Sequence, residues 1–217
     1  MAAHNLLANP DTFGLGRFVA GLVFPIGLMF VVITDGELFT GKMLLGDQLF
    51  KKSIRLIDML RDWIYVYVGN FIGSLLIVFL IYYSNQLNFS NGMLKEVTIM
   101  IAVNKVSLTF LSAFCLGILC NWIVCLAVYM SRKTQDMTGK LLCCFFPICL
   151  FITSGFEHSV ANMYYIPIGI LAANGMMPEL TWSAFFINNL LPVTLGNIAG
   201  GFVFVAMAYH YSEKQRY

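Results

Sequence analysis

The stretch Ser154-Gly155-Phe156-Glu157-His158-Ser159 puts a glycine, a carboxylate and an imidazole inside an otherwise apolar span. The apolar runs 141–153 and 160–173 flank it, and together they are long enough to cross a bilayer once, which takes about 20 to 25 residues. Irregular backbone and ionisable side chains persist at membrane depth only where protein buries them or where they line a cavity. The stretch therefore predicts a broken transmembrane helix and a candidate permeation site.

The composition is that of an integral membrane protein. Of the 217 residues, 59% are hydrophobic and 11% are charged, whereas a soluble domain carries about 25% charged residues. The net charge of +2 is too small to indicate nucleic-acid binding. No basic region precedes the first apolar run, so we expect no cleavable signal peptide. The repeated apolar spans predict one all-α helical domain over residues 1–217.

The cysteines indicate packing rather than metal binding. None forms a Cys-x-x-Cys pair, and their spacing to histidines is not that of zinc ligands. We therefore expect no metal and no other cofactor. The six residues are Cys115, Cys120, Cys125, Cys143, Cys144 and Cys149.

The basic residues predict the topology. The five expected spans cover about 13–33, 63–83, 99–130, 141–173 and 184–210. The segments 42–61 and 131–140 and the C-terminal tail hold five, three and two Lys or Arg, whereas the loops 84–98 and 174–183 hold one between them. By the positive-inside rule, the C-terminus is cytoplasmic and the N-terminus outside in a multi-pass protein of the plasma membrane. Arg17, near the outer end of the first span, is expected to snorkel to the interface.

Two pairs of similar motifs recur in the same order. Ile33-Thr34-Asp35-Gly36-Glu37 resembles Ile152-Thr153-Ser154-Gly155-Phe156-Glu157, and Gly69-Asn70-Phe71-Ile72-Gly73 resembles Gly196-Asn197-Ile198-Ala199-Gly200. The two copies enter the membrane from opposite sides, which predicts an inverted repeat over about 13–83 and 99–210. The third span precedes the second copy and has no counterpart before the first. We therefore expect that a helix is missing from the front.

Five ordered motifs across essentially the whole chain resemble the formate/nitrite transporter family of pentameric anion channels. The resemblance implies an aquaporin-like bundle of six helices, with broken helices and cytoplasmic termini, that assembles as a homopentamer in membrane lipid. This chain departs from that pattern by lacking the first helix and its amphipathic N-terminal segment. The motifs are Gly36-Glu37-Leu38-Phe39-Thr40-Gly41, Asn104-Lys105-Val106-Ser107, Gly117-Ile118-Leu119-Cys120-Asn121-Trp122, Gly155-Phe156-Glu157-His158-Ser159-Val160-Ala161-Asn162-Met163 and Leu191-Pro192-Val193-Thr194-Leu195-Gly196-Asn197.

The resemblance also implies roles for residues of the pore. A first break is expected at 34–41, before the second at 154–159. His158 would be the central pore histidine, Thr40 would face it from the first break, Lys105 would lie in the outer vestibule, and Asn121 would line the pore. The residues that would form apolar constrictions on either side of the histidine are Phe24, Leu28, Leu38, Phe39 and Phe151.

Elementary electrostatics gives these residue types a function. A bare anion entering apolar surroundings must be compensated or neutralised, and Lys105 supplies positive potential that concentrates anions. His158 could protonate a weak-acid anion, or stay neutral and only donate a hydrogen bond; burial disfavours a permanently charged ring. The alternatives are that Lys105 is the structural partner of a carboxylate and that His158 is a core histidine bonded to Glu157 or to backbone.

Four residues are predicted to anchor the breaks. We expect Glu37 and Glu157 to accept hydrogen bonds from backbone N–H groups that the breaks leave free. Asn70 and Asn197 occupy matching positions in the repeat. His4 and His210 are expected to be ordinary terminal histidines.

The sequence therefore predicts a channel or transporter, not an enzyme, for small monovalent weak-acid anions. Formate is the first substrate candidate, and nitrite and hydrosulfide are the alternatives. A neutral-solute channel of the aquaporin type ranks lower because paired Asn-Pro-Ala breaks are absent from the sequence. A membrane enzyme using His158 and Glu157 would need a metal cluster or a nucleophile, and the sequence indicates neither.

Overall fold

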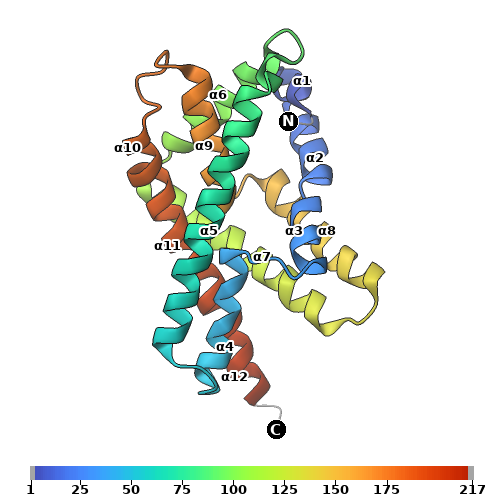
Figure 1. The fold of residues 1–217 in the computed structure, drawn as a ribbon. Helices are drawn as coiled ribbons and strands as arrows, with labels where there is room; N and C mark the ends of the chain where they lie inside the picture. Colours follow the sequence, from blue (N-terminus) through green and yellow to red (C-terminus); the bar gives the residue numbers. More distant parts are fainter. Residues whose placement is uncertain (1–2, 215–217) are drawn as a thin grey trace.

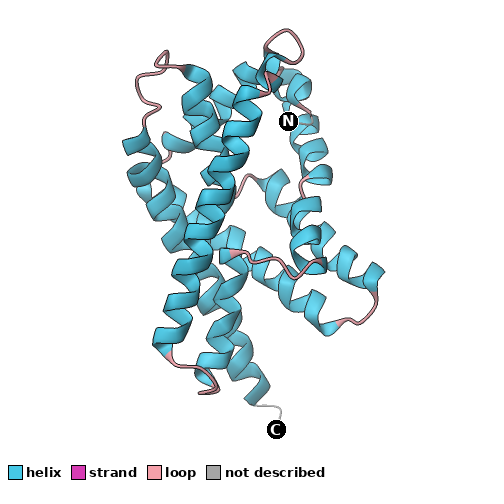
Figure 2. Ribbon diagram, in the orientation of Figure 1, coloured by secondary structure: helices cyan, strands magenta, loops and turns pink. Residues whose placement is uncertain are grey.

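A computed structural model describes residues 3–214, with the side chain of Lys214 left out, and this part of the chain consists of helices joined by loops and turns (Figures 1 and 2). Arg216, which contributes to the predicted charge of the tail, lies outside the described residues. The elements are α1 (His4–Leu7), η1 (Pro10–Thr12), α2 (Phe13–Val23), α3 (Ile26–Ile33), η2 (Phe39–Leu44), α4 (Leu45–Phe50), α5 (Leu56–Tyr83), η3 (Gln86–Asn88), α6 (Met93–Val106), α7 (Phe110–Lys133), α8 (Met137–Ser154), α9 (Ser159–Ala173), α10 (Trp182–Ala184), the π-helical η4 (Phe185–Leu190), α11 (Leu191–Gly201), the π-helical η5 (Phe202–Met207) and α12 (Ala208–Lys214).

Within residues 3–214, five helical stretches are long and apolar enough to cross a membrane, the number that the sequence predicts. They are Pro10–Ile33, Leu56–Tyr83, Phe110–Lys133, Met137–Ser154 and Trp182–Glu213. The N-terminus and the loops 84–92 and 174–181 lie at one end of the bundle, and the C-terminus and the loop 51–55 lie at the other (Figure 1).

The expectation of one continuous third span over 99–130 is wrong. The chain breaks between α6 and α7, so that Lys105 lies in the last turn of a half-length helix. The side chain of Thr109 causes a new helix to start there: its backbone is extended and its Oγ1 accepts a hydrogen bond from the Ser112 N–H at 3.2 Å. Threonine is a preferred residue at this N-cap position.

The second break, at 154–159 between α8 and α9, is defined by a helix end and a helix start. Gly155 ends α8 in the left-handed region at φ 77°, a conformation that glycine adopts without steric cost. His158 is the N-cap of α9 and holds an extended backbone. Only three residues therefore separate Gly155 from the new helix, and Glu157 and His158 lie within this short irregular segment.

Close packing between α7 and α11 fixes the centre of the bundle. A Cβ atom at Gly117 would lie 2.8 Å from the Val193 carbonyl oxygen, and a Cβ at Gly196 or Gly200 would overlap the α7 backbone at Phe114 or Ile118. Small residues let the two backbones approach this closely. This contact brings the side chains of Asn121 and Asn197 to the level of the breaks.

Candidate functional site

The two breaks meet at Thr40 and His158. The Thr40 Oγ1 lies 3.0 Å from His158 Nε2, and both side chains are buried. Thr40 comes from η2, directly after the first break, and His158 ends the second. The structure therefore brings together two residues that are 118 positions apart in the sequence. The sequence analysis predicts that these two residues face each other.

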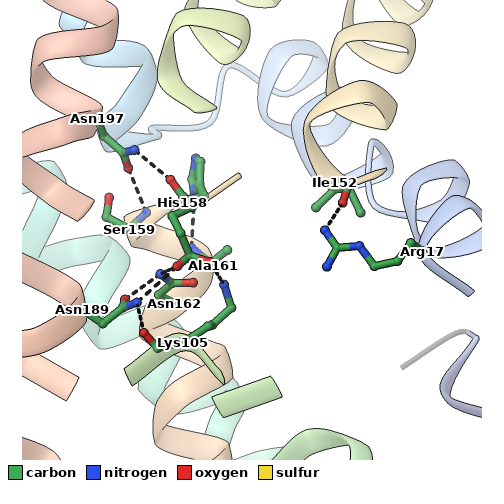
Figure 3. Close-up of polar contacts among 10 residues, drawn as sticks. Arg17, Lys105, Ile152, His158, Ser159, Ala161, Asn162, Asn189 and Asn197 are labelled. Carbon is green, nitrogen blue, oxygen red and sulfur yellow. Dashed lines mark hydrogen bonds and ion pairs between the residues drawn. The ribbon is translucent and has the colours of Figure 1, made fainter. Parts of the chain in front are cut away.

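The hydrogen bond of the other ring nitrogen, Nδ1, determines which nitrogen of the neutral His158 ring carries the proton. His158 Nδ1 accepts a hydrogen bond from the Ala161 N–H at 3.1 Å, the contact drawn in Figure 3. An accepting nitrogen cannot carry a proton, so the neutral ring is protonated at Nε2 and donates to the Thr40 hydroxyl. His158 thus bonds to backbone through one nitrogen and directs its N–H towards the opposite break.

An asparagine on α5 spans the first break. The Asn70 Oδ1 accepts from the Phe39 N–H at 2.9 Å, and its Nδ2 donates to the Glu37 carbonyl oxygen at 2.9 Å. One amide side chain thereby satisfies a donor and an acceptor that no helix uses. Leu38 is the single residue between them.

An asparagine on α11 spans the second break in the same way. The Asn197 Oδ1 accepts from the Ser159 N–H at 2.8 Å, and its Nδ2 donates to the Glu157 carbonyl oxygen at 3.0 Å (Figure 3). The Nδ2 also donates to the Gly117 carbonyl oxygen at 2.8 Å. The single residue between the two bonded positions is His158. The two anchoring asparagines therefore hold equivalent sites, with leucine in one and histidine in the other.

Asn121 ties the two breaks to each other. Its Nδ2 donates to the carbonyl oxygens of Thr40 at 3.1 Å and of Asn197 at 2.6 Å, and its side chain is fully buried. Cys125, one turn further along α7, directs its Sγ to the same Thr40 oxygen at 3.2 Å. The expected pore-lining asparagine thus uses its amide to fix the backbone around the site.

The expected partners of Glu157 were wrong. Its carboxylate pairs with the Lys105 ammonium at 2.7 Å and accepts from the Asn162 and Asn189 side-chain amides at 2.7 and 3.2 Å. These donors are side chains, whereas backbone N–H groups were predicted. The side chains of Lys105 and Glu157 are 15% and 7% exposed, and a carboxylate buried to this degree requires charged or polar partners. The alternative role of Lys105 as the partner of a carboxylate is therefore present in the structure.

The carboxylate of Glu37 also pairs with a lysine rather than with backbone. Its partner is Lys42, which additionally pairs with Asp62 at 3.2 Å. The side chain of Glu37 is 61% exposed. The two break glutamates thus have the same kind of partner in opposite surroundings.

The predicted constriction residues belong to one apolar cluster. The rings of Phe24 and Phe151 meet edge to face at 5.7 Å, and Phe151 lies 6.0 Å from the His158 ring. The ring of Phe39 also packs on the aromatic side chains of α5, 4.7 Å from Tyr67 and 6.4 Å from Trp63. These residues are Phe24, Leu28, Leu38, Phe39 and Phe151.

Two cavities flank the contact between the breaks. The Lys105 cavity, of about 290 Å³, is lined by polar and aromatic residues that include Arg17, Lys105, Phe156, Glu157 and Tyr165. The Lys42 cavity, of about 350 Å³, has in its lining Glu37, Leu38, Lys42, Arg132 and Lys140. Each cavity touches one break and contains the lysine–glutamate pair of that break.

The side chain of Arg17 does not extend to the membrane interface, contrary to the expectation. Its Nη2 donates to the Ile152 carbonyl oxygen at 2.8 Å, so the guanidinium turns inward to the end of α8 (Figure 3). Sequence reasoning also left out Asn189, although a polar side chain within an apolar span is the signal that would have identified it.

His210 is not an ordinary terminal histidine. Its side chain is buried, and its Nδ1 lies 3.0 Å from Asp47 Oδ1, which joins α12 to α4. Partial burial raises the pKa of the Asp47 carboxyl, but hydrogen bonds from Lys51 and His210 outweigh it and bring the pKa below its ordinary value. His4 bonds to Ser90 at 2.8 Å. Among the described residues, no group of three or more His, Cys, Asp or Glu side chains is arranged to hold a metal ion.

Comparison with known proteins identifies similar chains over nearly all of the sequence. A family model described as formate/nitrite transporter matches residues 1–211. The chain is 40% identical to the probable formate transporter of Methanothermobacter thermautotrophicus, covering 92% of this chain and 76% of that protein. It is 41% identical to the formate channel FocA of Haemophilus influenzae, covering 93% and 76%. A solved structure described as a pentameric formate channel with formate bound aligns with a TM-score of 0.84 at 34% identity, over 97% of this chain and 89% of that one.

Proposed function

Because this chain belongs to the formate/nitrite transporter family, a family of multi-pass membrane proteins, we propose that it conducts formate across a membrane between the Lys105 and Lys42 cavities. The observation that carries the proposal is the hydrogen bond between His158 and Thr40, which lies between two charged cavities. The relatives support formate as the substrate, since those at about 40% identity are named formate channels or transporters. Nitrite and hydrosulfide are not favoured by those names.

The tautomer of His158 supports a role as a hydrogen-bond donor. Formate that reaches the ring replaces the Thr40 hydroxyl and accepts the Nε2–H. The ring has no second proton to give, because its Nδ1 is occupied by the Ala161 N–H. The proton that neutralises formate therefore comes from the aqueous cavity, and low dielectric favours the neutral acid once it leaves water. Formic acid then crosses the apolar cluster around Phe151 without the cost of a buried charge.

Membership of the family also supports a proposal for how the chain assembles and how it is oriented in the membrane. A similar solved channel is described as pentameric, and we propose a homopentamer, which native mass spectrometry of the purified protein tests. The uneven distribution of Lys and Arg supports a cytoplasmic C-terminus and a plasma-membrane location. Reporter fusions at Lys140 and at Asn174 would place the two ends of the bundle. A fusion at Lys140 that reports the outside would contradict this orientation.

The proposed function also includes the internal repeat and excludes catalysis. The matching contacts of Asn70 and Asn197 support two copies over 13–83 and 99–210, one bringing each break to the pore. Transport of an unchanged substrate requires no covalent step, and we propose that the chain is not an enzyme. Formate recovered chemically unchanged after transport is the expected result.

Flux into proteoliposomes tests the function. Uptake of labelled formate should exceed uptake by protein-free vesicles. It should also rise as the external pH falls, because a larger fraction of the formate is then protonated. His158→Leu should reduce uptake about 10- to 150-fold, since a hydrogen bond to a charged group contributes about 1.5–3 kcal/mol, whereas His4→Leu is the control and should retain wild-type uptake. Uptake equal to that of protein-free vesicles would contradict the proposal. So would a His158→Leu variant with wild-type flux.

A further inference from the structure

The Lys105 cavity holds more positive than negative charge. Its lining residues include two cations, Arg17 and Lys105, and one carboxylate, Glu157. The ammonium of Lys105 lies 2.7 Å from that carboxylate. At this separation the two charges largely cancel for an ion that approaches from the cavity. The pair alone therefore provides little net attraction for an anion.

Arg17 has no such compensating partner. Among the described residues, no ion pair joins Arg17 to a carboxylate. Its Nη2 donates to the carbonyl oxygen of Ile152, in the last turn of α8, and the guanidinium lies 6.0 Å from the Phe13 ring. A guanidinium has five N–H donors. The contact with Ile152 uses one of them.

The second break contains a place for this guanidinium. A Cβ atom on Gly155 would overlap the Arg17 Nη2, so the absence of a side chain at this position makes room for the charge. The carbonyl groups at the end of α8 also favour a cation, because the C-terminal end of a helix carries partial negative charge. Arg17 is thus fixed at the edge of the break by contacts that leave its charge intact.

We infer that Arg17, and not Lys105, supplies the net positive charge that draws anions into the Lys105 cavity, and that its free N–H groups are the first partners of an incoming carboxylate. Guanidinium presents parallel N–H donors that match the two oxygens of a carboxylate. Lys105 is then a positioning residue that neutralises Glu157 next to His158. The inference rests on the proposed function, since it assigns the binding step of formate entry.

Formate uptake at two ionic strengths tests the inference. Intact cells and inverted membrane vesicles present the two ends of the channel separately. At about 0.01 M salt, Arg17→Gln should raise the half-saturating formate concentration about tenfold from the side of the Lys105 cavity, with maximal flux nearly unchanged, because a charged cavity concentrates counter-ions by about that factor or more. At about 1 M salt, where the Debye length is about 3 Å, the difference from wild type should nearly vanish.

Two variants separate charge from structure. Arg17→Lys keeps the charge and should stay within about threefold of wild type, as the field of a unit charge predicts. Lys95→Gln removes a cation of α6 that does not line the cavity, and it should behave as wild type. Equal loss of maximal flux in Arg17→Gln and Arg17→Lys, from both sides and at both salt concentrations, would overturn the inference and assign Arg17 a purely structural role.

A binding measurement keeps the inference independent of transport. Formate should raise the melting temperature of detergent-solubilised wild-type protein at low salt, because a ligand that binds the folded state stabilises it. The same rise should require about tenfold more formate in Arg17→Gln and an unchanged concentration in Lys95→Gln, because the stabilisation depends on the ratio of ligand concentration to dissociation constant. An Arg17→Gln variant with the same formate dependence as wild type would contradict the inference. A wild type that binds formate but carries none would contradict only the proposed function.

Discussion

The first and the second break use the same construction in different surroundings. In each, an asparagine amide bonds to the backbone on both sides of one residue, and a glutamate of the break pairs with a lysine. The residue between the bonds is Leu38 in the first break and His158 in the second. The glutamate of the pair is 61% exposed in the first break and 7% exposed in the second, whereas the lysines are 19% and 15% exposed.

The difference shows how one local construction serves two purposes. Water can compensate the Glu37 carboxylate, which is 61% exposed, and Lys42 is the side chain that pairs with it. The second break lies inside the protein, where each polar group requires a partner from the chain. Asn162, Asn189 and Lys105 supply those partners for Glu157. The buried copy is therefore the one that holds the titratable ring.

Removal of the lysine should produce the largest difference between the two breaks. Lys105→Met leaves the Glu157 carboxylate buried without its cation and should cost about 3–5 kcal/mol of unfolding free energy. Lys42→Met leaves Glu37 in water and should cost about 1 kcal/mol or less. Denaturant titration in detergent measures both. The double variant Lys105→Met with Glu157→Gln should recover stability, and equal losses in the two single variants would contradict the difference in burial.

Removal of the asparagine should have the next largest effect. Asn197→Ala leaves the Ser159 N–H and the Glu157 and Gly117 carbonyl oxygens without this partner, and a buried unsatisfied group costs about 1–3 kcal/mol. Asn70→Ala affects two groups near the exposed side of the molecule and should cost about 1 kcal/mol. Melting temperatures of the purified variants would rank the two. A larger loss for Asn70→Ala would show that the first break depends more on its amide.

Substitution of the glycines beside the asparagines should change stability with opposite signs in the two copies, and Gly69→Ala should give the smallest effect. A Cβ at Gly196 would overlap the Phe114 carbonyl oxygen, and Gly196→Ala should cost about 1–3 kcal/mol. Nothing lies within 4 Å of a Cβ at Gly69, and Gly69→Ala should stabilise α5 by about 0.5–1 kcal/mol because alanine loses less backbone entropy in a helix. Thermal unfolding of both variants provides the comparison. Destabilisation by Gly69→Ala would indicate that another helix packs on this face.

The positions of the breaks could be predicted from the sequence because a bilayer tolerates few polar residues. The glycine, glutamate and histidine at 155–158 stand out in an apolar span, and the two Gly-Asn motifs reveal the repeat. The number of spans can be predicted for the same reason, since polar loops separate the apolar spans. The contact between Thr40 and His158 was expected from the family resemblance, and the structure contains it.

The partners of individual side chains could not be predicted, because they depend on distances between helices. Glu157 meets Lys105 across 52 positions, and no pattern within either span indicates that pairing. The direction of Arg17 depends on a space that exists only because α2 packs beside the end of α8. The break at Thr109 is a local signal that was overlooked: threonine at an N-cap is recognisable, but the apolar residues around it favour a continuous span.

The long sequence separation of the anchoring contacts has a consequence for biogenesis. Thr40 enters the membrane early in synthesis, but the Asn121 amide that bonds to its carbonyl oxygen follows 81 residues later. The second break lacks its anchoring amide until Asn197, on the last span, has been synthesised. Until that helix inserts, the Ser159 N–H and the Glu157 carbonyl oxygen lack this partner, and an unsatisfied backbone group in lipid costs several kcal/mol. A ribosome that stalls before α11 should therefore yield a chain whose second break is not held in place.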